Sequence, residues 1–266
     1  MNQQTFRRNW LRLHERYENR MYRTFIRSLK HSVSSIRFDN LNKESYKALI
    51  EFNVNNELIS KAYYDGYLAV GMIHGRRVGR SISKETKNFS PDTFADTFKQ
   101  TLLEWLRSNA GLRITSVRQT LVDYLIKEIE KGIQQDLDIR EIAKNMQKLV
   151  NSRSFYRWQA LRIARTETTA AANFGAISAG NDSGIVMDKL WISATDNRVR
   201  RNEKGDRYDH LDLNGVKVGK DELFEDNGAF LRFPGDPNAP AGTVINCRCT
   251  VALVPKRNSE GRLVFV

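Results

Sequence analysis

Both cysteines of this 266-residue chain lie in one short stretch, Asn246-Cys247-Arg248-Cys249. Residues i and i+2 of an extended strand share one face, so the thiols of Cys247 and Cys249 are predicted to point in the same direction. We expect them to face a common partner. Asp196 and His210, upstream in the chain, are the candidate partners.

These residue types suit a zinc ion. Thiolate, imidazole and carboxylate groups are the zinc ligands found in proteins, so Cys247, Cys249, His210 and Asp196 form a candidate ligand set. A metal would also fix a loop-rich module that has little core of its own. The alternative is a pair of buried structural thiols with His210 in a hydrogen bond. A disulfide between cysteines this close in sequence would be strained, and it is not expected in a reducing cytosol.

A cysteine hydrolase is the third interpretation, with Cys247 as nucleophile, His210 as base and Asp196 orienting the base. A catalytic cysteine usually benefits from a helix N-terminus or a cationic setting that lowers the pKa of its thiol. Cys247 instead lies in a predicted strand beside a second thiol. No Walker, His-Glu-x-x-His or nucleophile-elbow motif occurs in the chain. We therefore expect that the protein is not an enzyme.

The first part of the chain is predicted to be helical. Apolar residues recur at steps of three and four from Phe6 to Leu29, which predicts a long amphipathic helix. Further helices are predicted over about residues 43–80, from Ser90-Pro91 onward, and from Thr115-Ser116 to near Gly132. Two more are predicted over about residues 138–150 and 154–179, and Asp138 is the capping residue of the first of these two. Gly71, Gly75 and Gly79 recur at steps of four, which indicates that another helix crosses closely there; an exposed loop over residues 75–79 is the alternative.

The first predicted helix carries a basic face. Its arginines, mostly off the apolar stripe, are Arg7, Arg8, Arg12, Arg16, Arg20, Arg23 and Arg27. The chain has a net charge of +12, and residues 1–40 alone carry nine Lys or Arg against three Asp or Glu. This pattern indicates an anionic neighbour such as nucleic acid or an acidic protein surface, and a merely solvated face is the alternative. We interpret these arginines as candidate nucleic-acid-binding residues.

After Gly180 the pattern changes to short apolar runs with turn signals between them. Strands are predicted at residues 189–193, 216–218, 230–233, 244–254 and 263–266. The predicted fold class is α+β, with a predominantly helical N-terminal part followed by a small β-containing C-terminal module. We divide the chain into a helical region, residues 1–150, and an α+β module, residues 151–266. No apolar run of roughly 18 residues occurs, so no membrane contact is expected.

Three motifs follow one another in the second half of the chain. They are Arg165-Thr166-Glu167, then Trp191 with Asp196-Asn197-Arg198-Val199-Arg200 and His210, then Asn246-Cys247-Arg248-Cys249. In this order they resemble the phage Mu protein F-like family of minor head proteins, also described as head morphogenesis proteins, over about residues 130–255. The family places its histidine two or three residues after the second arginine. Here residues 201–209 intervene, which resembles a polar loop insertion.

The resemblance implies a structural protein of the virion. Such proteins are internal head components that associate with the portal protein and in some cases are ejected with the genome. The implied partners are the portal, other head proteins and packaged double-stranded DNA. The implied location is inside the capsid near the portal, after assembly in the host cytoplasm. The alternative is a basic nucleic-acid-binding protein with a small metal-stabilised Cys/His module and no virion role.

The motif residues are predicted to hold the module together. They are Arg165, Glu167, Trp191, Asp196, Arg198, Arg200, His210, Cys247 and Cys249. Arg165 and Glu167 are expected to form salt bridges that fix the late helix to the β-containing part, with Asp196, Arg198 and Arg200 as partners. A catalytic Glu167 is the alternative, although no nucleophile or cofactor motif accompanies it.

Overall fold

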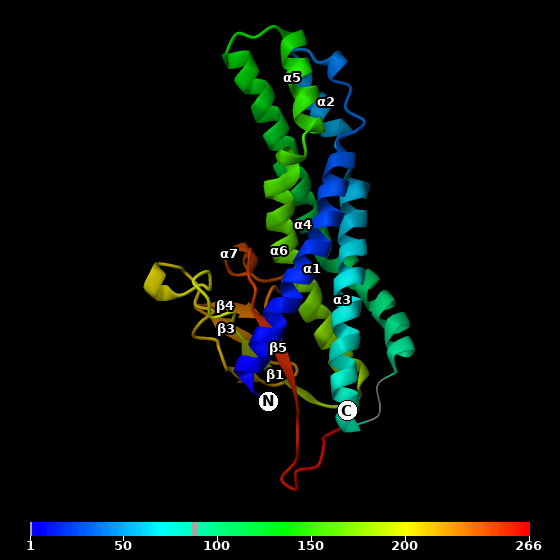
Figure 1. Ribbon diagram of the computed structural model, residues 1–266, viewed down its shortest axis with the longest axis vertical. Helices are drawn as coiled ribbons and strands as arrows, with labels where there is room; N and C mark the ends of the chain where they lie inside the picture. Colours follow the sequence, from blue (N-terminus) through cyan, green and yellow to red (C-terminus); the bar gives the residue numbers. More distant parts are fainter. Residues whose placement is uncertain (1, 87–89) are drawn as a thin grey trace.

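The computed structural model describes residues 2–86 and 90–266. Long helices form an elongated column, and the β-containing part lies beside its lower half (Figure 1). The fold is α+β, as predicted. Within the described residues, no helix combines the length and apolar character needed to cross a membrane.

Six helices make up the column. They are α1 (Gln3–Ser32), α2 (Tyr46–Asn53), α3 (Asn56–Thr86), α4 (Pro91–Gln134), α5 (Ile139–Asn151) and α6 (Arg153–Asp182). The buried residues of α1, among them Trp10, Tyr17 and Phe25, follow the predicted apolar stripe. Two predicted starts are confirmed, because the side chains of Ser90 and Asp138 accept hydrogen bonds from the first turns of α4 and α5.

Two predicted helix boundaries were wrong. The helix expected over residues 43–80 is divided into α2 and α3, because the side chain of Asn55 accepts from the backbone N–H groups of Glu57 and Leu58 and caps a new helix. The two helices expected on either side of Thr115-Ser116 are one helix, α4. The hydroxyl of Thr115 donates to the carbonyl of Gly111 one turn back, so it does not break the helix.

Helices α3 and α6 cross in direct backbone contact, as the glycine spacing predicted. A Cβ on Gly75 would lie 2.7 Å from the carbonyl oxygen of Gly175, and one on Gly71 would lie 2.9 Å from that of Ala171. Both distances are shorter than real Cβ contacts, so only glycine allows this approach. Helix α6 also packs along α1 and therefore occupies the centre of the column.

The β-containing part has two small antiparallel sheets. In the first, β1 (Met187–Ile192) lies between β2 (Lys217–Val218) and β5 (Thr250–Pro255), with Trp191 opposite Val251. The second is a hairpin of β3 (Phe224–Asp226) and β4 (Ala229–Leu231). A short 3₁₀ turn (Phe38–Asn40, η1) follows α1, and a second (Asn202–Lys204, η2) lies in the loop after β1.

The predicted strands are only partly correct. The run expected over residues 244–254 begins as a short helix, α7 (Ala241–Val244), and becomes a strand at Thr250. Residues 263–266 form isolated bridges, such as Ile185 with Phe265. The strand at Phe224–Asp226 was missed. One apolar core joins the column to the β-containing part, since Trp10 of α1 and Trp191 of β1 belong to the same buried cluster.

Candidate functional site

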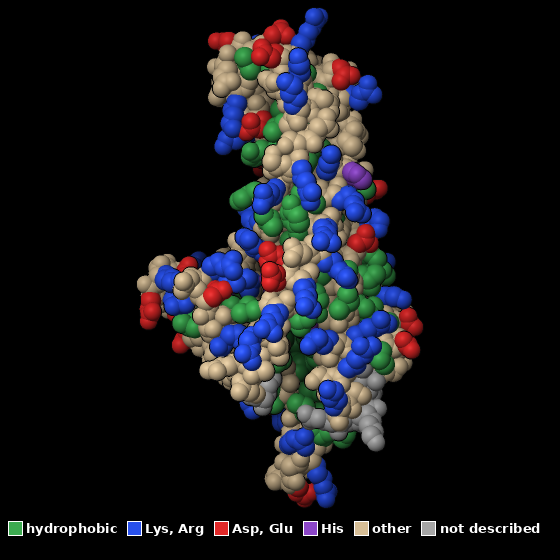
Figure 2. All heavy atoms as spheres, viewed as in Figure 1, with side chains coloured by type: hydrophobic (Ala, Val, Ile, Leu, Met, Phe, Trp, Pro, Cys, Tyr) green, Lys and Arg blue, Asp and Glu red, His purple; other side chains and the backbone are tan. Residues whose placement is uncertain are grey.

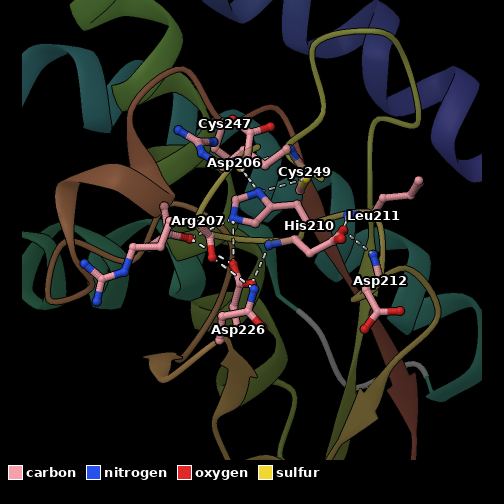
Figure 3. Close-up of polar contacts among 12 residues, drawn as sticks. Asp206, Arg207, His210, Leu211, Asp212, Asp226, Cys247 and Cys249 are labelled. Atoms are coloured by element: carbon pink, nitrogen blue, oxygen red, sulfur yellow. Dashed lines mark hydrogen bonds and ion pairs between the residues drawn. The ribbon is translucent and has the colours of Figure 1, made fainter. Parts of the chain in front are cut away.

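His210, in the loop that connects η2 to β2, faces both thiols with one side of its ring (Figure 3). Its Nδ1 is 3.5 Å from Sγ of Cys247 and 3.7 Å from Sγ of Cys249. All three side chains are buried, with 1–2% of their surface exposed. Cys247 and Cys249 occupy the extended segment between α7 and β5. The prediction that they face one partner is confirmed, and that partner is His210.

The other ring nitrogen of His210 faces Asp226 at the end of β3. Nε2 lies 3.3 Å from Oδ2 of Asp226 and 2.7 Å from Oγ1 of Thr243 on α7. Asp226 also accepts the backbone N–H of Asp209 at 2.7 Å, which fixes its carboxylate. Sequence reasoning missed Asp226. The available signal was the following pair, Asn227-Gly228, which adopts positive φ at both residues and turns the β3–β4 hairpin.

The two thiols and the imidazole differ in how the surroundings shift their pKa values. Hydrogen bonding from Cys249 and the charge of His210 hold the pKa of the Cys247 thiol well below its usual range, against the effect of burial. Burial raises the pKa of Cys249 well above its usual range. Burial alone would lower the pKa of His210, but Cys247 and Asp226 together raise it to about 9. In the absence of another positive charge, the arrangement favours a Cys247 thiolate paired with a protonated His210.

Helix α6 fixes the backbone of the cysteine segment. The Thr166 hydroxyl accepts the N–H of Asn246 at 3.0 Å, and the Thr169 hydroxyl donates to the carbonyl of Cys247. Asn173 donates to the carbonyl of Cys249 at 3.3 Å and accepts the N–H of Val251 at 2.9 Å. Sequence reasoning missed Thr169 and Asn173. Polar residues at steps of three and four within an Ala- and Gly-rich helix were the signal.

Arg165 and Glu167 have partners other than those predicted. Glu167 accepts from Arg113 at 2.8 Å and from the hydroxyl of Tyr67 at 2.6 Å, so it joins α6 to α4 and α3. Arg165 pairs with Glu18 of α1 at 3.0 Å. Both residues fix α6 within the helical column, whereas the sequence analysis placed their partners in the β-containing part.

Asp196 does not belong to the cysteine cluster, which corrects the predicted ligand set. Its carboxylate lies 2.5 Å from Arg248 and accepts the backbone N–H of Arg198 at 2.9 Å. Arg200 donates to the carbonyl of Ile245 at 2.5 Å. Asp196 and Arg200 therefore hold the cysteine segment, at Arg248 between the two cysteines and at Ile245 before them, while Arg198 contacts Asp196.

Trp191 forms one wall of the cluster. The indole is fully buried and its ring lies edge-on to His210, with the centroids 5.2 Å apart. Phe224 of β3 packs on it at 5.1 Å. The motif tryptophan thus packs the cluster into the same apolar core that contains Cys247 and Cys249.

The arginines of α1 divide into two groups. Arg7 is half-buried and donates to the carbonyl of Ser193 at 2.9 Å and to the side chain of Asn214 at 3.0 Å, so it is a structural residue. The other predicted nucleic-acid-binding residues are exposed: Arg8, Arg12, Arg16, Arg20, Arg23 and Arg27.

A basic groove lies between α1 and α3. We define it by its cationic lining residues, Arg16, Arg20, Arg77, Arg80 and Lys84. Leu13, Tyr17, Ile73 and Ser81 complete the described lining, which includes no carboxylate, and the groove encloses about 680 Å³. Lys and Arg side chains predominate on this face of the molecule (Figure 2). Sequence reasoning found the α1 half of the groove and missed the α3 half.

The fold and site describe a helical column with a small β-containing module built around a buried thiol–imidazole cluster. Residues 123–252 match the family model described as Phage Mu protein F like protein. This region of the chain is therefore similar to the Phage Mu protein F-like family, a family of phage head morphogenesis proteins. The matched residues run from α4 to β5 and include the three motifs.

A further similarity is to the uncharacterized protein YqbB of Bacillus subtilis (strain 168). The two chains are 26% identical over 154 residues, which is 57% of this chain and 46% of YqbB. The present chain thus spans less than half the length of this relative. No solved structure matches the chain significantly.

Proposed function

We propose that the protein is a minor component of the phage head that assembles at the portal and contacts the packaged DNA from inside the capsid. The family match over residues 123–252 carries this proposal. The matched region is the part that the motif residues hold rigid, so it is the natural scaffold for a structural role. Ejection with the genome would follow from a position beside the DNA at the portal.

A structural role also accounts for the buried cluster better than catalysis does. Cys247, His210 and Asp226 have the order of a nucleophile, a base and an orienting carboxylate. However, both the sulfur and the imidazole lie in the core with 1–2% exposure, so a substrate has no access to them. Glu167, the other catalytic candidate, is 3% exposed, and its carboxylate accepts hydrogen bonds from Tyr67 and Arg113.

The basic groove supports contact with DNA. Arg16 and Arg20 are one helical turn apart on α1, and Arg77, Arg80 and Lys84 follow each other along α3, so the cations form two parallel rows. Neutralising phosphates with such rows supplies the non-specific part of DNA affinity and makes it depend on salt. We propose that this groove is the DNA-facing surface.

Co-expression with the proteins encoded by this chain's genomic neighbours, a portal protein among them, tests the head role. We expect the chain and the portal protein to co-purify as a ring-sized complex, and imaging of that complex should show density for the helical column at the ring. Purified particles should contain the chain. A portal ring that forms without it, together with particles that lack it, would contradict the proposal. Salt-sensitive DNA binding in that case would favour a nucleic-acid-binding protein without a virion role.

A further inference from the structure

We infer that Cys247, Cys249 and His210 bind a zinc ion through their two sulfurs and Nδ1. Asp226 contacts Nε2, the other ring nitrogen of His210. This inference does not depend on the proposed head role. Asp196, the carboxylate expected from the sequence to bind the ion, is not part of this site. Asp226 contacts the histidine and not the ion.

The spacing of the three atoms is that of a tetrahedral zinc site. Zinc–sulfur bonds of about 2.3 Å and zinc–nitrogen bonds of about 2.0–2.1 Å, set at tetrahedral angles, separate a sulfur from a nitrogen ligand by about 3.6 Å. The structure places Nδ1 of His210 3.5 Å from one sulfur and 3.7 Å from the other. All three atoms lie within 4.8 Å of one another. The two sulfur–nitrogen distances therefore match those expected around one shared zinc ion.

Asp226 prepares His210 for metal binding. A histidine that ligates zinc commonly donates its other ring N–H to a carboxylate, which fixes the tautomer and the ring orientation. Here Nε2 faces Asp226 at 3.3 Å and the Thr243 hydroxyl at 2.7 Å, and that hydroxyl is itself 3.4 Å from Asp226. Protonation of Nε2 leaves the lone pair of Nδ1 directed at the two sulfurs.

A divalent cation is compatible with charge balance in the core. Uncompensated charge is costly in a buried region. Zn²⁺ with two thiolates and a neutral imidazole forms a group with no net charge. The buried indole N–H of Trp191, whose ring lies against His210, has Cys249 as its hydrogen-bonding neighbour. A metal-bound thiolate at Cys249 would accept from this donor.

The site connects segments that have little regular secondary structure of their own. His210 comes from a loop of irregular structure, Asp226 from a three-residue strand, and the cysteines from the segment before β5. A metal shared by these segments adds its binding free energy to that of folding. The fourth position has no candidate among the His, Cys, Asp and Glu side chains of the described chain, and we assign it to water.

The test uses the full-length, tag-free protein purified without chelator. We expect one zinc per chain by elemental analysis, and a thiolate-to-cobalt charge-transfer band after exchange with Co²⁺. The double substitution Cys247→Ser/Cys249→Ser should abolish both signals. His74→Phe, which removes a buried imidazole outside the cluster, should leave both unchanged.

Asp226→Asn separates metal binding from folding. It retains all three ligands, so we expect the same stoichiometry at saturating metal with zinc affinity weakened 10- to 100-fold in competition with a chromophoric chelator. Wild-type protein that is folded and reduced, yet holds no zinc and gives no cobalt band, would overturn the inference. Equal metal uptake by the double cysteine variant would identify the metal as adventitious and overturn it as well.

Discussion

At the scale of single residues, Glu167 shows how the motif acts within the column. Its carboxylate is buried and accepts from both Arg113 and Tyr67, which belong to two other helices. A buried charge is tolerated only when its partners are present, and removing one partner leaves the other charge uncompensated. The motif glutamate therefore joins three helices through one side chain.

Replacing Glu167 by Gln should destabilise the protein by about 3 kcal/mol, because Arg113 would remain buried without its counter-charge. Urea denaturation followed by circular dichroism measures the change in the free energy of unfolding. Glu260→Gln is the matched control, since the pair of Glu260 with Arg262 is exposed and should contribute less than about 0.5 kcal/mol. Equal losses in the two variants would contradict the importance assigned to the buried pair.

Two buried histidines predict a loss of stability in acid. Burial, with Arg77 nearby, lowers the pKa of His74 to about 4, and burial with Arg248 and other cations lowers that of His14 to about 3. The unfolded chain therefore binds protons that the folded chain rejects below pH 6.5. Stability should fall as pH drops through this window, by up to about 1.4 kcal/mol per pH unit for each histidine.

His74→Phe tests this pH dependence and retains an aromatic ring against Trp10 and Tyr17. Between pH 6 and pH 4 the slope of unfolding free energy against pH should decrease by up to about 1.4 kcal/mol per unit. Urea titrations at several pH values measure the slope. His31→Gln, which changes an exposed histidine at the end of α1, should leave it unaltered. An unchanged slope in His74→Phe would show that this residue is already protonated in the folded protein.

The sequence did not predict which residues the motif residues would contact. The sequence predicted that Cys247, Cys249 and His210 lie together, because residue type and strand period are local properties. It selected Asp196 over Asp226 as the nearby carboxylate. Which carboxylate lies beside His210 depends on where the β3–β4 hairpin packs, and that is set by tertiary contacts. Glu167 similarly pairs with Arg113, from a helix for which no motif gave a signal.

At the scale of elements, the crossing of α3 and α6 depends on glycine. Gly75→Ala should destabilise the protein by about 1–3 kcal/mol, because the new methyl group would contact the backbone of Gly175, which cannot move aside. Gly111→Ala is the control. Gly111 lies in α4 with open space around its Cα, so alanine should stabilise the helix by up to about 1 kcal/mol. The melting temperature should fall in Gly75→Ala and rise in Gly111→Ala. A change in the same direction in both variants would contradict the close crossing of α3 and α6.

Elements were predictable where their signals are local. The apolar period of α1 and the caps Ser90 and Asp138 identified helices correctly. The single helix α4 was divided in error at Thr115-Ser116, because hydroxyl residues suit both caps and helix interiors and only packing decides between them. β2, β4 and β5 are shorter than the predicted runs, β1 begins two residues earlier than predicted, and β3 was missed.

At the scale of the whole molecule, charge is arranged unevenly over the surface. The chain has a net charge of +12, and the basic groove gathers five cations from two helices without a carboxylate in its described lining. Some other charges on the column, such as those of Lys61 with Asp65 and Lys131 with Glu128, form local ion pairs. The α1–α3 face therefore offers a long anionic polymer a row of cations without a neighbouring carboxylate.

Substituting Arg16→Ala together with Arg20→Ala should weaken binding to duplex DNA of any sequence and reduce the slope of log affinity against log salt by about 1.8, since each phosphate contact contributes about 0.9. Fluorescence anisotropy over a series of salt concentrations measures both quantities. Arg153→Ala with Arg157→Ala is the matched control, because it removes two exposed arginines with the same spacing from α6, outside the groove. Equal losses in the two double variants would show that net charge alone attracts DNA, and no binding by the wild type at low salt would exclude the groove as a DNA surface. A selective loss in the groove variant would instead identify the α1–α3 face as the DNA-binding surface of the proposed head protein.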